Sequence, residues 1–212
     1  VSERISNTCL FYKDRTGDWG HIPEDIRFAI REMAVYLSKN VEFYPDDLSG
    51  NHIINNSRAL IISGHALYME ELKNLGREIL SYILPRLIDD AGFLREGSSH
   101  YQFLITRWLL EIRMVCDDKD DEITLQILKP YVIASIKACK FFIVKDEMKQ
   151  VRIPIIGDIS PDCKLEWIKD IIDSSLVQNN CDEDRKGWST LFEKWKPKYF
   201  FDFELKDDQF YL

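Results

Sequence analysis

The segment Asn51-His-Ile-Ile-Asn-Asn-Ser-Arg-Ala-Leu-Ile-Ile-Ser-Gly-His-Ala-Leu-Tyr68 carries the pattern that decides the fold class. Its apolar residues recur at three- and four-residue spacing, as they do along one face of an amphipathic helix. The same spacing continues over long windows on both sides, interrupted by short clusters of helix-breaking residues. We therefore predict an all-α body, with this segment as one of its amphipathic helices.

Further segments with the same spacing define the rest of that body. The predicted helices span residues 24–39, 51–68, 71–84, 99–115, 122–145, 164–176 and 184–194. Pro85 is expected to disturb the end of its helix, and the acidic run 117–122 is expected to be a solvated loop. Because short connections make neighbouring helices antiparallel, the pattern favours a helical barrel or toroid built from helix pairs.

The end of the chain has a different pattern. In Tyr199-Phe-Phe-Asp-Phe-Glu-Leu205, apolar and polar residues begin to alternate, as in an extended strand. We therefore expect a helical domain over residues 1–197, and over 198–212 a linker and first strand that lead to a sheet domain outside this chain. Since the chain starts at Val1 without a methionine and ends on apolar residues, we expect it to be part of a longer protein.

Composition excludes several classes of protein. The 212 residues include 28 Lys and Arg against 36 Asp and Glu, a net charge of −8, which argues against binding nucleic acid through its phosphates. The five cysteines form no CxxC pair, so the sequence offers neither a zinc ribbon nor a thioredoxin-type site. No apolar stretch approaches the roughly 20 residues of a membrane-spanning helix.

Asn51 and His52 lie where a polar loop turns into the helix 51–68. Histidine can act as a general base near neutral pH, and asparagine can polarise a carboxylate without adding charge. The alternative is purely local: Asn51 caps the helix and His52 is an ordinary first-turn residue.

Tyr101 lies at a second such transition, in Gly92-Phe-Leu-Arg-Glu-Gly-Ser-Ser-His-Tyr-Gln102. A tyrosine hydroxyl in a cleft can donate or accept a proton in a reaction. Here too a local alternative exists, because Ser99 and Gln102 have the spacing of a capping box and Tyr101 could simply pack against its neighbours.

Taken together, the two segments resemble the heparinase II/III-like polysaccharide lyases, a group that includes related alginate lyases. The matching text is ordered along the chain and covers most of residues 1–162. It comprises Val1-Ser-Glu-Arg-Ile-Ser-Asn7, Glu42-Phe-Tyr44, Leu48-Ser-Gly-Asn-His52, Arg58-Ala-Leu60, Arg95-Glu-Gly-Ser-Ser-His-Tyr101 and Ile153-Pro-Ile-Ile-Gly-Asp158. The resemblance implies an incomplete (α/α) toroid with a long cleft, followed by a β-sandwich-type domain.

The resemblance also implies an activity, the β-elimination of a uronate-containing acidic polysaccharide. Asn51 matches the asparagine that neutralises the uronate carboxylate, and His52 matches the histidine beside it. Tyr101 matches the tyrosine that protonates the departing O4 and, for one stereochemistry, also removes the C5 proton. For the opposite stereochemistry His52 is the natural base. The family often has histidine after this tyrosine, whereas here His100 precedes Tyr101.

Other residues in the matching segments are candidates for substrate binding. They are Asn55, Asn56, Arg95, Glu96, His100 and Asp158. Each also has a simpler role: a solvated loop carboxylate for Glu96, a turn cap for Asp158, exposed helix positions for the asparagines and a surface cation for Arg95. His65, inside an apolar helix, is expected to pack, and Arg58 and Arg107 are expected to be surface or ion-pairing residues.

Two rival functions remain open at this point. A glycoside hydrolase on a similar toroid would use two carboxylates across the cleft, with Glu96 and Asp158 as the pair, and a glycan-binding relative would retain the fold without turnover. The resemblance implies no cofactor or metal in this chain; the structural zinc of some relatives belongs to the C-terminal sheet domain. It suggests the periplasm or the cell exterior, and the scattered cysteines leave the cytoplasm open.

Overall fold

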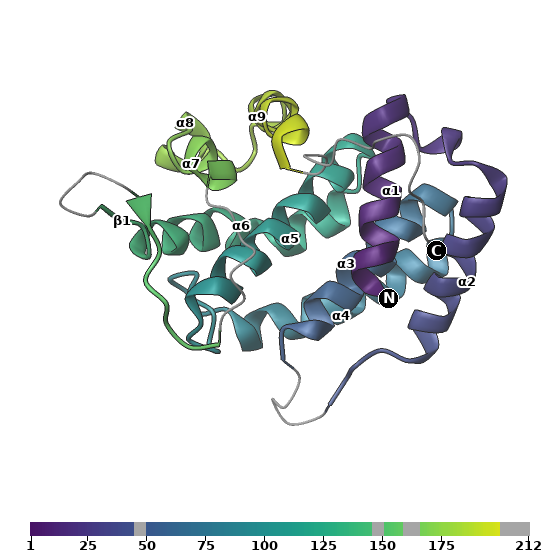
Figure 1. Cartoon of the computed structure of the whole chain (residues 1–212), viewed down its shortest axis with the longest axis horizontal. Helices are drawn as coiled ribbons and strands as arrows, with labels where there is room; N and C mark the ends of the chain where they lie inside the picture. The colour runs from purple at the N-terminus through teal and green to yellow at the C-terminus, as the bar shows by residue number, and fades with distance from the viewer. Residues whose placement is uncertain (45–49, 146–150, 159–165, 200–212) are drawn as a thin grey trace, which may run out of the picture.

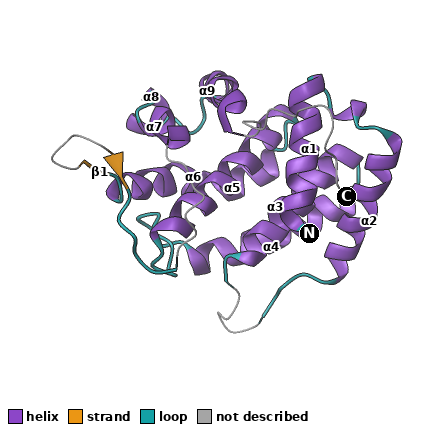
Figure 2. Cartoon of the chain, viewed as in Figure 1, coloured by secondary structure: helices purple, strands orange, loops and turns teal. Residues whose placement is uncertain are grey.

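The computed structural model describes residues 1–44, 50–145, 151–158 and 166–199, and these residues are mostly helical (Figures 1 and 2). The helices are α1 (Ser2–Thr16), a 3-10 turn η1 (Trp19–His21), α2 (Glu24–Lys39), α3 (His52–Leu67), α4 (Glu70–Leu87), α5 (Ser99–Asp118), α6 (Glu122–Phe141), α7 (Glu166–Ile172), α8 (Ser175–Gln178) and α9 (Arg185–Tyr199). The all-α class predicted from the sequence is confirmed.

Helix α3 is the central element of the fold. It packs against α1, α2, α4 and α5, so neighbours surround it on several sides. Both its apolar residues and its small polar residues are buried, from Ile53 through Ala66 with few exceptions. The prediction of an amphipathic helix is therefore wrong for this segment, because a helix enclosed by four others has no solvent face to keep polar.

Two glycines allow α3 and α4 to pack very closely. A Cβ atom added at Gly64 of α3 would lie 2.7 Å from the backbone nitrogen of Lys73 in α4. In the reverse direction, a Cβ at Gly76 of α4 would lie 2.9 Å from the Ser57 carbonyl oxygen in α3. The Ser57 hydroxyl also donates a 2.6 Å hydrogen bond to the Gly76 carbonyl oxygen. At these two points the helix backbones themselves are in contact.

The second half of the chain adds a layer to this centre. Helices α5 and α6 pack together, and α7, α8 and α9 lie along one side of them (Figure 1). In the described residues the sheet content is one short antiparallel pair, β1 (Val144–Lys145) with β2 (Val151–Arg152), in which Val144 pairs with Arg152. The chain after β2 then returns to the start of α5.

Several element boundaries differ from those predicted. Helix α1 was not predicted, the helix expected over 122–145 ends at Phe141 before β1, and the helix expected over 164–176 is divided into α7 and α8. Pro85 does not end its helix, since α4 continues to Leu87. The expected strand 199–205 begins at the last residue of α9, and its remainder lies outside the described residues. Among the described helices, none is both long and apolar enough to cross a bilayer.

The contact at Gly76 generates a prediction about stability. Alanine normally stabilises a helix interior relative to glycine by about 1 kcal/mol, but here its Cβ would press against the α3 backbone. We expect Gly76→Ala to lower the free energy of unfolding by about 1–3 kcal/mol, as overpacking typically does. Ser81→Ala, at an exposed position of the same helix, is the matched control, and urea titration is the measurement. Equal stability of the two variants would contradict the close approach.

Candidate active site

The first part of the candidate site is a carboxylate that holds Asn51. Asn51 precedes α3 but does not cap it with its side chain. Instead its backbone N–H donates to Glu96 Oε1 at 2.8 Å, and its side-chain Nδ2 donates to Glu96 Oε2 at 2.9 Å. Gly50 lets the carboxylate approach, because a Cβ there would lie 3.2 Å from Oε1. The simple capping role for Asn51 is therefore wrong, and Glu96 fixes the orientation of its amide.

The second part brings Tyr101 to the 153–158 loop. Ser98 caps α5 by accepting a 3.1 Å hydrogen bond from the Tyr101 backbone N–H. The expected capping box of Ser99 and Gln102 is wrong by one residue, and the Gln102 side chain instead bonds Leu94 and Gly92. From this first turn of α5, the Tyr101 hydroxyl donates to Asp158 Oδ2 at 3.3 Å.

The loop that carries Asp158 is attached to the start of α5 by backbone contacts. The Ser98 hydroxyl donates to the Asp158 carbonyl oxygen, and the Ser99 N–H donates to the Ile156 carbonyl oxygen at 3.0 Å. Gly157 has a φ of 71°, in the left-handed region, and lies against Gly97. A side chain at Gly157 would be strained and would also meet that backbone. The loop therefore holds the Asp158 carboxylate beside the tyrosine.

These neighbours raise the pKa of Tyr101. Partial burial contributes most, followed by the negative charge and hydrogen bond of Asp158 and the charge of Glu96; a side-chain hydrogen bond with Asn51 acts in the opposite direction. Asn51 is hydrogen-bonded to Glu96 and Tyr101 to Asp158, and the interactions of Tyr101 with Glu96 and Asn51 join the two pairs into one polar cluster. The Tyr101 hydroxyl therefore holds its proton more tightly than the hydroxyl of a free tyrosine does.

His52 is oriented differently from Asn51. Its Nδ1 lies 2.9 Å from Glu42 Oε2, and its side chain is 68% exposed. No hydrogen bond or ion pair among the described residues joins it to the cluster of Asn51, Glu96, Tyr101 and Asp158. The other histidine at the site, His100, has its ring centroid 5.5 Å from that of Tyr101.

The remaining candidates have varied surroundings. Asn56 is buried and accepts a 2.8 Å hydrogen bond from the Ser2 hydroxyl of α1. Asn55 donates to Glu3 of α1 at 3.3 Å and accepts from Arg58 at 2.9 Å. These contacts turn both asparagines toward α1. Arg95 is exposed next to Glu96.

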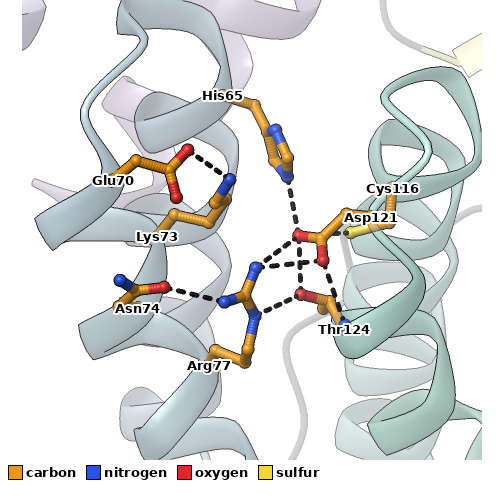
Figure 3. A network of polar contacts seen from close by, with 8 residues as sticks. All are labelled: His65, Glu70, Lys73, Asn74, Arg77, Cys116, Asp121 and Thr124. Atoms are coloured by element: carbon orange, nitrogen blue, oxygen red, sulfur yellow. Dashed lines mark hydrogen bonds and ion pairs between the residues drawn. The ribbon is translucent and has the colours of Figure 1, made fainter.

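A second polar cluster was missed by the sequence analysis (Figure 3). Asp121, the N-cap of α6, lies with its carboxylate 2.9 Å from His65 Nε2 and accepts two 3.0 Å hydrogen bonds from Arg77 Nη2. It also accepts from the Thr124 backbone N–H and hydroxyl. The expected solvated loop is therefore wrong at Asp121, which is buried, and His65 is part of a polar network rather than packing alone.

His65, Cys116 and Asp121 place three potential metal-ligand atoms within 4.8 Å of one another. One observation argues against a metal there. The Arg77 guanidinium already neutralises Asp121 and would repel a cation. Burial and the charge of Asp121 raise the pKa of the Cys116 thiol well above its usual range. The cluster is best explained as a structural link between α3, α4 and the start of α6.

Comparisons of the chain with protein-family models, with curated protein sequences and with solved structures find no match. The residue geometry described above is therefore what supports any assignment of function.

The Asp121 cluster makes stability depend on pH. Burial alone would raise the pKa of Asp121, but hydrogen bonds from His65, Thr124 and Arg77 outweigh it and place the pKa well below its usual range. A lowered pKa means that the folded state favours the carboxylate. This stabilisation is complete above the unfolded-state pKa of ~3.9 and is lost as the pH falls below it toward the folded-state pKa.

We expect Asp121→Ala to lower the free energy of unfolding at neutral pH by about 3–5 kcal/mol, because Arg77 loses its buried partner. The variant should also lose less stability than wild type between about pH 4 and pH 2. Glu183→Ala is the control, since Glu183 pairs with Lys129 at the surface with 85% of its side chain exposed. Denaturant titrations at several pH values measure both effects, and parallel pH curves for wild type and Asp121→Ala would contradict this explanation.

Proposed function

We propose that the protein is a polysaccharide lyase that cleaves a uronate-containing acidic glycan by β-elimination. One observation carries the proposal: Asn51 at the start of α3 and Tyr101 at the start of α5, the residues that match the lyase pattern, belong to one polar cluster with Glu96 and Asp158. Fifty positions separate the two residues in the sequence, and nothing local requires them to meet.

Each residue of the cluster has a chemical role in this proposal. The Asn51 amide has two N–H donors. Glu96 takes one, and we assign the other, which interacts with the Tyr101 hydroxyl in the free protein, to the uronate carboxylate. Neutralising that carboxylate stabilises the enolate-like intermediate formed when the C5 proton leaves. Tyr101 then gives the departing O4 its hydroxyl proton, which it donates to Asp158 in the free protein. His52 is the base that removes the C5 proton.

The proposal includes a more detailed fold than the all-α class. We propose that the helix pairs are part of an incomplete (α/α) toroid, and that the residues after α9 lead into a β-sandwich-type domain. The packing of α3 against α4 and of α5 against α6 supports the first part. A structural zinc, where relatives have one, would belong to the second.

The test is ultraviolet absorbance of the unsaturated uronate during incubation of the full-length protein with a panel of uronate polysaccharides. We expect absorbance to rise with wild type, and Tyr101→Phe to reduce the rate by about 10²-fold or more, because the proton donor for O4 is lost. Glycan binding should survive in this variant. Tyr36→Phe, at an exposed tyrosine of α2, is the matched control. Unchanged turnover by Tyr101→Phe would remove the proposed mechanism.

A glycoside hydrolase is the second candidate. One observation favours it: the negative charges of two carboxylates, Glu96 and Asp158, both raise the pKa of Tyr101. A hydrolase would produce new reducing ends without any rise in absorbance. Its activity would be lost in Glu96→Gln or Asp158→Asn and would tolerate Tyr101→Phe. Glycan binding without cleavage in either assay would identify a non-catalytic relative.

A further inference from the structure

The pairing of His52 with Glu42 lies outside the polar cluster of Asn51, Glu96, Tyr101 and Asp158. Nδ1 of His52 lies 2.9 Å from Glu42 Oε2, and the two side chains are 68% and 52% exposed. Exposed pairs contribute little to stability. The effect of the pair is therefore on the chemistry of the imidazole rather than on stability.

The segment that carries Glu42 is held against α4. The ring centroids of Phe43 and Tyr82 lie 5.3 Å apart, and the Arg86 guanidinium lies 3.7 Å from the Tyr82 ring centroid. The Phe43 N–H donates to the Val41 carbonyl oxygen at 2.8 Å, in a tight turn around Glu42. The residue that follows Glu42 is thus in contact with α4.

A carboxylate at Nδ1 determines which imidazole nitrogen carries the proton. A carboxylate only accepts hydrogen bonds, so the Glu42 oxygen 2.9 Å from Nδ1 favours a proton on that nitrogen. In the neutral ring the lone pair is then on Nε2. A free histidine in water favours the opposite tautomer, with the proton on Nε2.

We propose that Glu42 is a positioning residue that holds His52 in the Nδ1–H tautomer and so presents Nε2 as the acceptor of the C5 proton. This inference rests on the proposed lyase function. The proton on C5 goes to Nε2 of His52, and the electron pair of the C5–H bond forms the C4–C5 double bond. The C4–O4 bond breaks, and O4 takes the proton of Tyr101. Proton exchange with solvent then restores both side chains, so no oxidant or further reactant is needed.

The first test reads the tautomer directly and needs no substrate. Nitrogen-15 NMR of the imidazoles distinguishes protonated from unprotonated ring nitrogens, at a pH about two units above the ordinary histidine pKa of ~6.5. We expect Nδ1–H for His52 in wild type and a change toward Nε2–H in Glu42→Ala. His21 is an internal control: its Nδ1 lies 3.3 Å from Asp18 and its side chain is 67% exposed. Its signals should change in Asp18→Ala and not in Glu42→Ala. An unchanged His52 tautomer in Glu42→Ala would overturn the inference.

The second test measures turnover on the uronate polysaccharide that wild type cleaves. We expect Glu42→Ala to lower kcat about tenfold or more with little change in KM, since the base is misoriented while Asn51, held by Glu96, still binds substrate. Asp18→Ala should match wild type. A tautomer change with unchanged kcat would overturn the positioning role. A tautomer change in a protein that cleaves no uronate glycan would instead reject the lyase proposal, and the assignment of His52 as its base, while leaving the His52–Glu42 pair itself established.

Discussion

Arg58 lies in the middle of α3 with none of its side chain exposed, and the packing around it depends on neutralising that charge. Its Nε lies 2.5 Å from Glu111 Oε2 of α5, which is equally buried. From α1, Asn7 accepts a 2.9 Å hydrogen bond from Nη2 and Glu3 lies 3.2 Å from Nη1. An unpaired charge inside a protein is strongly destabilising. Helices α1, α3 and α5 must therefore keep one relative position, which the hydrophobic effect alone, being non-directional, would not specify.

This constraint also locates the candidate site. Asn51 lies at the start of α3 and Tyr101 at the start of α5, so the ion pair between Arg58 and Glu111 fixes the two helices that carry them. The loop before α5 adds a second attachment, because Glu96 bonds both the backbone and the side chain of Asn51. A site built this way is held by rigid helices on one side and a backbone-bonded loop on the other. Such support is what a geometry-dependent reaction requires.

The sequence predicted those helix starts that a local pattern of residues marks. The starts of α2, α3 and α5 were found because a proline or a polar loop directly precedes apolar spacing. Helix α1 was missed since its buried face includes Ser2, Ser6 and Cys9, and small side chains weaken an apolar stripe. The role of Asp121 was missed for another reason: its partners, His65 and Arg77, come from α3 and α4. No sequence pattern within the acidic run 117–122 distinguishes Asp121, whose carboxylate contacts His65 and Arg77, from the carboxylates that are exposed to solvent.

The same reasoning explains why the candidate site was predicted only in outline. The residue types and their order indicated Asn51, His52 and Tyr101, yet they did not reveal that Asn51 is held by Glu96 or that His52 turns to Glu42. In the proposed lyase reaction, these partners influence which side chain gives a proton and which one takes a proton. Burial and the two carboxylates near Tyr101 raise its pKa, so its hydroxyl holds its proton more tightly than a free tyrosine does. The exposed imidazole of His52, with Nδ1 2.9 Å from the Glu42 carboxylate, has the chemistry of a base near neutral pH, which in the proposed reaction leaves the Tyr101 hydroxyl to protonate the leaving group.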